Sequence, residues 1–174
     1  MLKYSLKNDI GGDIMQEEVR IKIRSVRYEV EASLFSDEDG AEGLTLIEGK
    51  DMEPETVEIN TVGVLREADG RIEVSYEETE VTGMDGSTTA VSFLREQSGI
   101  VTMLREGAVS TALVFEEGKR HHCVYNTPFM PFQICVHTLK VDNGIMENKI
   151  LELDYVVEIR GAQAERTKFR MELL

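Results

Sequence analysis

The chain has 174 residues, of which 41% are apolar, and this length and composition suit one domain with one hydrophobic core. Its formal net charge of −14 disfavours nucleic acid and anionic membranes as partners, because contacts to phosphate depend on clustered Lys and Arg. The start MLKYSLKNDIGGD lacks an apolar signal segment, no apolar run approaches the roughly 18 residues of a membrane span, and two cysteines are too few for a disulfide framework. We therefore expect a cytoplasmic protein with free thiols.

The first part of the chain is predicted to be a loose N-terminal extension over residues 1–18, followed by a single domain over 19–174. Apolar residues alternate with polar ones from Val19 to Leu34, as in a half-buried strand, but their parity switches around Ser25. This switch predicts a β-bulge, since one extra residue moves the following side chains to the other face. The acidic, glycine-containing segment 36–55 is predicted to be an exposed loop or a flap over one end of the domain.

The same two-residue alternation continues to the C-terminus, with turn sequences such as EADG and GMDG between the apolar runs. It predicts further strands at 57–65, 71–80, 87–95, 100–105, 109–115, 121–125, 133–141, 150–159 and 168–173. No segment carries a helical apolar stripe of three turns, so the strands must bury their apolar faces on one another. An all-β, antiparallel, meandering barrel of about eight to ten strands does this and leaves few free edges, with a sandwich as the alternative.

The stretch HHCVYNTPFMPFQ raises the question of a metal site or a nucleophile. A bend centred on Phe129 would place Cys123 opposite Cys135 and His121 opposite His137 on one sheet face, where four such ligands suit zinc. A flat pair of strands gives these ligands little freedom to converge, so buried cysteines and solvated histidines are the favoured interpretation. A cysteine enzyme is disfavoured too, because side chains two positions apart on a strand point in parallel, about 7 Å from each other. We expect no metal and no cofactor.

Polar residues that share the parity of the inward apolar set are candidates for a site inside the barrel. The predicted inward residues are Val57, Ile59, Leu65, Ile72, Val74, Tyr76, Val109, Leu113, Phe115, Leu151, Leu153, Tyr155, Val157, Ile159, Phe169, Met171 and Leu173. Glu78 and Arg105 continue this parity near a barrel end, where they pair with each other or where Arg105 receives an acidic or carbonyl group of a ligand. The predicted ligand-binding residues are Tyr76, Glu78, Arg105, Tyr125, Thr127 and Tyr155.

Several segments in a common order resemble the YwiB-like family of small uncharacterised proteins, known mainly from Firmicutes. They are VSYEE at 74–78, MLREGAV at 103–109, LVFEEG at 113–118, VYNTPF at 124–129 and LELDYVVEI at 151–159. The resemblance implies a calycin-like barrel, related in shape to lipocalins, with no established activity. The chain departs from the family pattern at Met130 and Pro131, where the family tends to have glycine, and in the length of segment 36–55.

Three functions follow in order of preference. The first is non-enzymatic binding of a small molecule in the barrel or at its mouth, which draws on the fold analogy. The second is a protein-interaction or structural module with a solid core, as a monomer or a homodimer. The third is a cysteine- or zinc-dependent enzyme, which we do not expect because no catalytic constellation can be placed with defined geometry.

Overall fold

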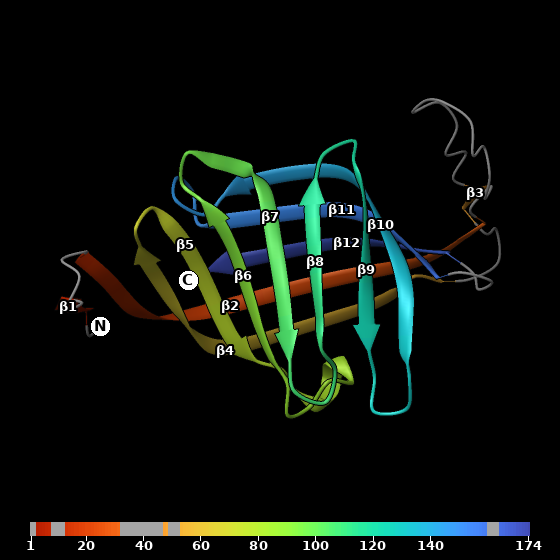
Figure 1. Cartoon of the computed structure of the whole chain (residues 1–174), viewed down its shortest axis with the longest axis horizontal. Helices are drawn as coiled ribbons and strands as arrows, with labels where there is room; N and C mark the ends of the chain where they lie inside the picture. The colour runs from red at the N-terminus through yellow and green to blue at the C-terminus, as the bar shows by residue number, and fades with distance from the viewer. Residues whose placement is uncertain (1–2, 8–12, 32–46, 49–52, 160–163) are drawn as a thin grey trace.

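The computed structural model describes residues 3–7, 13–31, 47–48, 53–159 and 164–174, and most of them lie in strands (Figure 1). Of the described residues, no helix is long and apolar enough to cross a membrane. The elements are β1 (Lys3–Lys7), β2 (Asp13–Glu31), β3 (Ile47–Glu48), β4 (Glu55–Ala68), β5 (Arg71–Glu77), the 3-10 helix η1 (Glu80–Thr82), β6 (Thr88–Leu94), β7 (Gln97–Glu106), β8 (Thr111–Glu116), β9 (Arg120–Asn126), β10 (Pro131–Gly144), β11 (Ile150–Ile159) and β12 (Ala164–Leu173).

The strands form one antiparallel sheet in the order β8-β7-β6-β5-β4-β2-β12-β11-β10-β9. In Figure 1 the strands from β6 to β9 run across β2, β12 and β11 behind them, so the sheet curls into a flattened barrel. Its two ends meet between β8 and β9, where Ser110 and Asn126 form an isolated bridge. The prediction of an all-β, antiparallel, meandering barrel is confirmed.

The N-terminal region is more structured than the sequence predicted. Residues 13–18, which the sequence analysis assigned to an extension, form the first part of β2 and pair with β4, beginning with Ile14 opposite Ala68. The strand β1 pairs with β2 in turn. Most of the acidic segment predicted at 36–55 lies outside the described residues.

The predicted β-bulge at Ser25 is wrong. The pairing of β2 with β4 runs without a shift from Ile14 to Arg27, and the pairing with β12 is equally regular. Because the strand keeps its parity, Val26 and Val30 lie on the outer face. Both are buried there, and Val30 belongs to a small separate cluster with Val156 and Ala164. The change of apolar parity in the sequence therefore marks a second apolar patch and not an inserted residue.

The inner face holds the main core, and the predicted inward residues lie there. Of these, Val109 and Ile159 lie at the edge of the core and line a cavity. Phe115, Leu151 and Met171 are completely buried.

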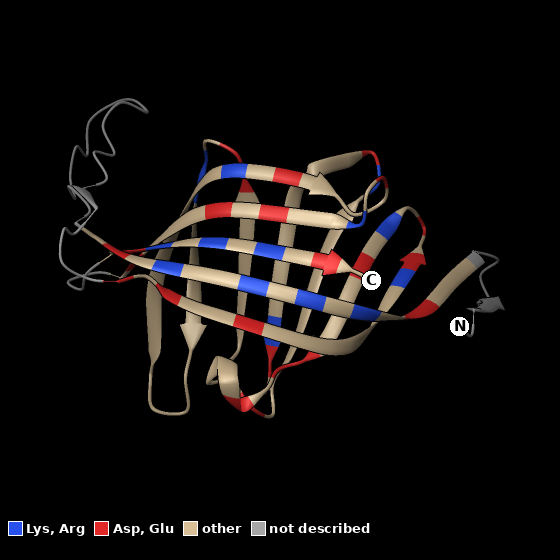
Figure 2. Ribbon diagram, turned by 180° about the vertical axis from the view of Figure 1, so that it is seen from behind, with Lys and Arg blue, Asp and Glu red and all other residues tan. Residues whose placement is uncertain are grey.

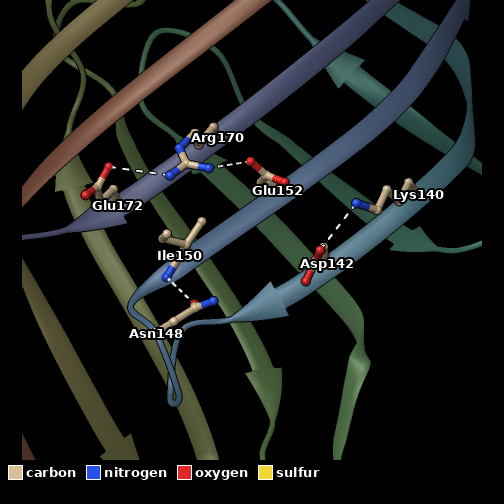
Figure 3. A network of polar contacts seen from close by, with 7 residues as sticks. All are labelled: Lys140, Asp142, Asn148, Ile150, Glu152, Arg170 and Glu172. Carbon is tan, nitrogen blue, oxygen red and sulfur yellow. Dashed lines mark hydrogen bonds and ion pairs between the residues drawn. The ribbon is translucent and has the colours of Figure 1, made fainter.

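The outer face is charged, and Figure 2 shows Lys and Arg alternating with other residues along β2 and β12. Ion pairs link these charges within and between strands: Figure 3 shows Arg170 of β12 between Glu152 of the neighbouring β11 and Glu172 of its own strand. This contrast between the faces explains why alternation predicted the strands well.

Candidate functional site

The barrel holds a partly open cavity of about 700 Å³, a size that accommodates a small organic molecule. Apolar side chains from both halves of the barrel form most of its wall: Ile23, Val57, Ile59, Leu113, Ile134, Val157 and Phe169. The loop carrying η1 contributes Thr82 and Met84, and the β9–β10 hairpin contributes Phe132. Both connections lie at the lower end of the barrel in Figure 1, so the cavity extends towards that end.

All six predicted site residues line this one cavity. They come from β5, β7, β9, β11 and the segments directly after β5 and β9, which the antiparallel order brings around a common interior. Parity alone predicted the inward position of Tyr76, Glu78, Arg105 and Tyr155, while Tyr125 and Thr127 were predicted as neighbours of Arg105. Their role in ligand binding stays a prediction.

Glu78 and Arg105 form the ion pair that the sequence analysis considered for them. Arg105 Nε lies 3.7 Å from Glu78 Oε1, and the two side chains are 16% and 2% exposed. The hydroxyl of Thr89 donates a hydrogen bond of 2.5 Å to the same carboxylate oxygen. A buried carboxylate needs such partners, because an uncompensated charge in the interior costs several kcal/mol.

The strand register explains why these groups meet. Tyr76 of β5 lies opposite Thr89 of β6, Thr89 lies opposite Arg105 of β7, and Arg105 lies opposite Thr111 of β8. The side chains of directly opposed residues project from the same face, so the register makes one polar row across four strands on the inner surface. Arg105 also donates to the sulfur of Met103 at 3.5 Å, but within the described chain its Nε has no hydrogen-bond partner.

Two tyrosines add neutral hydroxyls to the interior. Burial is the main cause that raises the pKa of Tyr76, and Glu78 raises it further. Burial also raises the pKa of Tyr155, although Arg105 opposes this effect. Both phenols therefore keep their protons at neutral pH and can donate hydrogen bonds. The ring of Tyr155 packs against Phe115, with 4.7 Å between the ring centroids.

Tyr125 and Thr127 lie at the hairpin end of the cavity. Tyr125 is half-buried and packs against the core. The hydroxyl of Thr127 donates to the carbonyl of Met130 at 2.8 Å and accepts from the amides of Phe129 and Met130. Because these bonds stabilise the turn, the structure gives Thr127 a structural task that the sequence analysis did not foresee.

Parity reasoning missed Thr89, which is not part of the lining but donates a hydrogen bond to Glu78, and several polar residues of the lining, among them Arg27 and Thr167. Arg27 of β2 and Thr167 of β12 line the cavity as a pair of directly opposed residues in the pairing of these two strands. Thr89 could have been found, because it shares the parity of Val91 and Phe93. Arg27 was hidden by the incorrect bulge, which assigned it to the outer face.

The predicted register of the β9–β10 hairpin is wrong by one residue. Cys123 lies opposite Ile134, and Cys135 lies opposite His122, so the two cysteines occupy opposite faces of the sheet. His121 and His137 are separated in the same way, because a shift of one position exchanges the faces. The proposed zinc arrangement therefore does not form, and no cluster of metal-binding side chains occurs among the residues that the structure describes.

Cys123 does not have the environment of a nucleophile. Burial raises the pKa of its thiol, whereas a reactive cysteine requires a stabilised thiolate. His121, two residues away, lies 3.6 Å from the carboxylate of Glu116. We therefore assign no catalytic role to this pair.

Comparisons with known proteins place the chain in a family. The model of a family described as a domain of unknown function, DUF1934, matches residues 44–171. Among solved structures, the chain is similar to the crystal structure of the ywiB protein from Bacillus subtilis, with a TM-score of 0.60 and 17% sequence identity over 91% of this chain and 93% of that one. At this identity the likeness shows the fold alone. None of the curated proteins shows significant sequence similarity. The chain belongs to the DUF1934 family, and its predicted resemblance to the YwiB-like proteins is confirmed.

Proposed function

We propose that this protein binds a small, largely apolar molecule inside its barrel, with a hydrogen-bond acceptor of the ligand directed at Arg105. The observation that carries this proposal is the cavity of about 700 Å³, in which an apolar wall surrounds a few convergent polar side chains. This combination is typical of ligand sites, since apolar area supplies affinity and a few polar groups fix the orientation.

Arg105 and the two buried tyrosines support the polar part of the proposal. The Nε of Arg105 lacks a hydrogen-bond acceptor in the described chain, and an unused buried donor is costly unless something accepts from it. A carbonyl or similar oxygen of a ligand would satisfy this donor. The hydroxyls of Tyr76 and Tyr155 are further donors that line the same cavity.

Native mass spectrometry after gentle purification tests the proposal. We expect a small molecule of defined mass to remain bound to the protein. Unfolding the protein would release this molecule for chemical identification. A variant that fills the cavity provides the sharper test. Val57→Trp puts a large ring into the cavity wall, whereas Val62→Trp puts the same ring on the outer face of β4, where Val62 is 54% exposed.

The two tryptophan variants give opposite expectations. The Val57→Trp protein should fold and lose the ligand, while the Val62→Trp protein should keep it. Equal retention by both variants would show that the molecule is bound elsewhere, and a protein free of any bound molecule that also fails to take up apolar probes would argue against a binding function.

A second candidate function is self-association as an interaction module, and the β9–β10 hairpin favours it. Phe129 at its tip is 95% exposed, and Met130 and Phe132 beside it are 54% and 40% exposed. Exposed apolar side chains grouped in this way commonly mark contact surfaces. Sedimentation of the wild type and of Phe129→Ser would decide this: a homodimer that becomes monomeric in the variant supports the candidate, and a monomeric wild type rejects it.

A further inference from the structure

The charged groups around the cavity have a combination of signs that bears on the chemistry of the ligand. Glu78 lies within 3.7 Å of Arg105, and its side chain is only 2% exposed, so the positive charge of Arg105 is compensated inside the protein. Arg27, the other arginine of the lining, lies 3.9 Å from Glu165 and 3.5 Å from Glu55. Each arginine already has a carboxylate partner.

The cavity lining as a whole is slightly acidic. The lining contains two arginines, Arg27 and Arg105, and three glutamates, Glu29, Glu78 and Glu165. The whole chain has a formal net charge of −14. The remaining polar groups near Arg105 are uncharged, because burial raises the pKa of both Tyr76 and Tyr155. Hydrogen-bond donors are thus abundant in the cavity, but excess positive charge is absent from its described lining.

A carboxylate ligand would meet two obstacles in this cavity. It would lose its water, and it would approach Arg105 beside the carboxylate of Glu78, where like charges repel at low local dielectric. A neutral acceptor such as an amide or ketone oxygen meets neither obstacle. It can accept a hydrogen bond from Arg105 without adding charge to the interior.

We propose that the cavity selects uncharged, acceptor-bearing apolar molecules over carboxylates, and that Glu78 is the residue that determines this specificity. The inference rests on the proposed function and names the ligand class for the same site. Without Glu78, Arg105 would present an uncompensated charge to the cavity, and the preference would shift towards carboxylates.

Displacement of the neutral fluorophore N-phenyl-1-naphthylamine by decanamide and by decanoate at neutral pH tests the inference, since these two compounds differ only in the charge and donor capacity of the head group. We expect decanamide to bind the wild type about tenfold more tightly than decanoate. In Glu78→Gln we expect the affinity for decanoate to rise about tenfold, with much less change for decanamide.

Two further variants control for general effects of charge. Glu77→Gln makes the same change in net charge at an exposed neighbouring position, and it should leave the ratio of the two affinities unchanged. The double variant Glu78→Gln/Arg105→Gln removes both charges and should lose the gain in decanoate affinity. Circular dichroism establishes that each variant is folded.

The outcomes separate this inference from the proposed function. Equal affinities of the wild type for decanamide and decanoate overturn the selectivity, and this result requires no variant. An unchanged ratio in folded Glu78→Gln overturns the role of Glu78. In either case binding itself would stand. If the fluorophore and both competitors fail to bind the wild type, the proposed function falls and the inference falls with it.

Discussion

Replacing Gly63 with alanine probes how closely β4 and β5 are packed against β2. Gly63 is buried in the middle of β4 and lies opposite Tyr76. A Cβ atom at this position would lie 2.3 Å from the carbonyl oxygen of Ser75 and 2.5 Å from Cδ1 of Ile21. Both distances are far below ordinary contact, and the oxygen belongs to a paired strand that cannot move without losing hydrogen bonds.

The expected cost follows from these two contacts. Overpacking a core typically costs 1–3 kcal/mol, and weakening one ladder hydrogen bond adds about 1 kcal/mol, so we expect a loss of about 3 kcal/mol. For a domain of this size, that loss corresponds to a fall in Tm of roughly 6–12 °C. Gly99→Ala is the matched control, because Gly99 also lies in a strand and a Cβ there meets nothing within 4 Å.

Urea unfolding followed by far-ultraviolet circular dichroism measures both variants, since the chain has no tryptophan for fluorescence. Gly99→Ala should be neutral or slightly stabilising, because alanine restricts the unfolded chain more than glycine does. A Gly63→Ala protein as stable as Gly99→Ala would refute the close approach of β2, β4 and β5 on which the reasoning depends.

Three other predictions concern the buried polar groups and the thiols. Arg105→Gln should lower the free energy of unfolding, measured with urea, by about 3 kcal/mol, because Glu78 stays buried without its partner. The double variant with Glu78→Gln should recover part of this loss, and additive losses in the two single variants would contradict the pairing. Because burial raises the pKa of Tyr155 above its ordinary value of 10.0, its contribution to stability is complete below about pH 10 and is lost as the pH rises further. The urea midpoint should therefore fall as the pH rises above about 10, and it should fall less in Tyr155→Phe. An oxidant such as diamide should form no disulfide between Cys123 and Cys135 in the folded protein, and a mass decrease of two hydrogens without unfolding would show that the hairpin register is different.

The successes of the sequence analysis have a common physical origin. A strand with one face in a core and one in water must alternate, and this holds strand by strand without knowledge of the neighbours. Parity therefore placed Tyr76, Arg105 and Tyr155 on the inner side, and the barrel closed around them. The pairing of Glu78 with Arg105 followed from the cost of burying either charge alone.

The predictions failed where contacts with a neighbouring segment decide which face of a strand a side chain occupies. The apolar residues after Ser25 in β2 looked like the continuation of the inner face, but Val30 is buried on the outer face by contacts with Val156 and Ala164. The register of the β9–β10 hairpin was predicted from a bend centred on Phe129. The observed register is shifted by one position, and a shift of one position is enough to reverse every side chain.

By itself the sequence determined that this chain is an all-β protein with an apolar interior and a charged exterior, because local alternation and turn residues are properties of short segments. Only the tertiary structure decided which residues face one another across the barrel, how closely Gly63 approaches β5, and that a cavity remains beside Arg105. These depend on register and on the closure of the whole sheet, where a single-residue shift or a few side-chain volumes change the result while the local pattern stays the same.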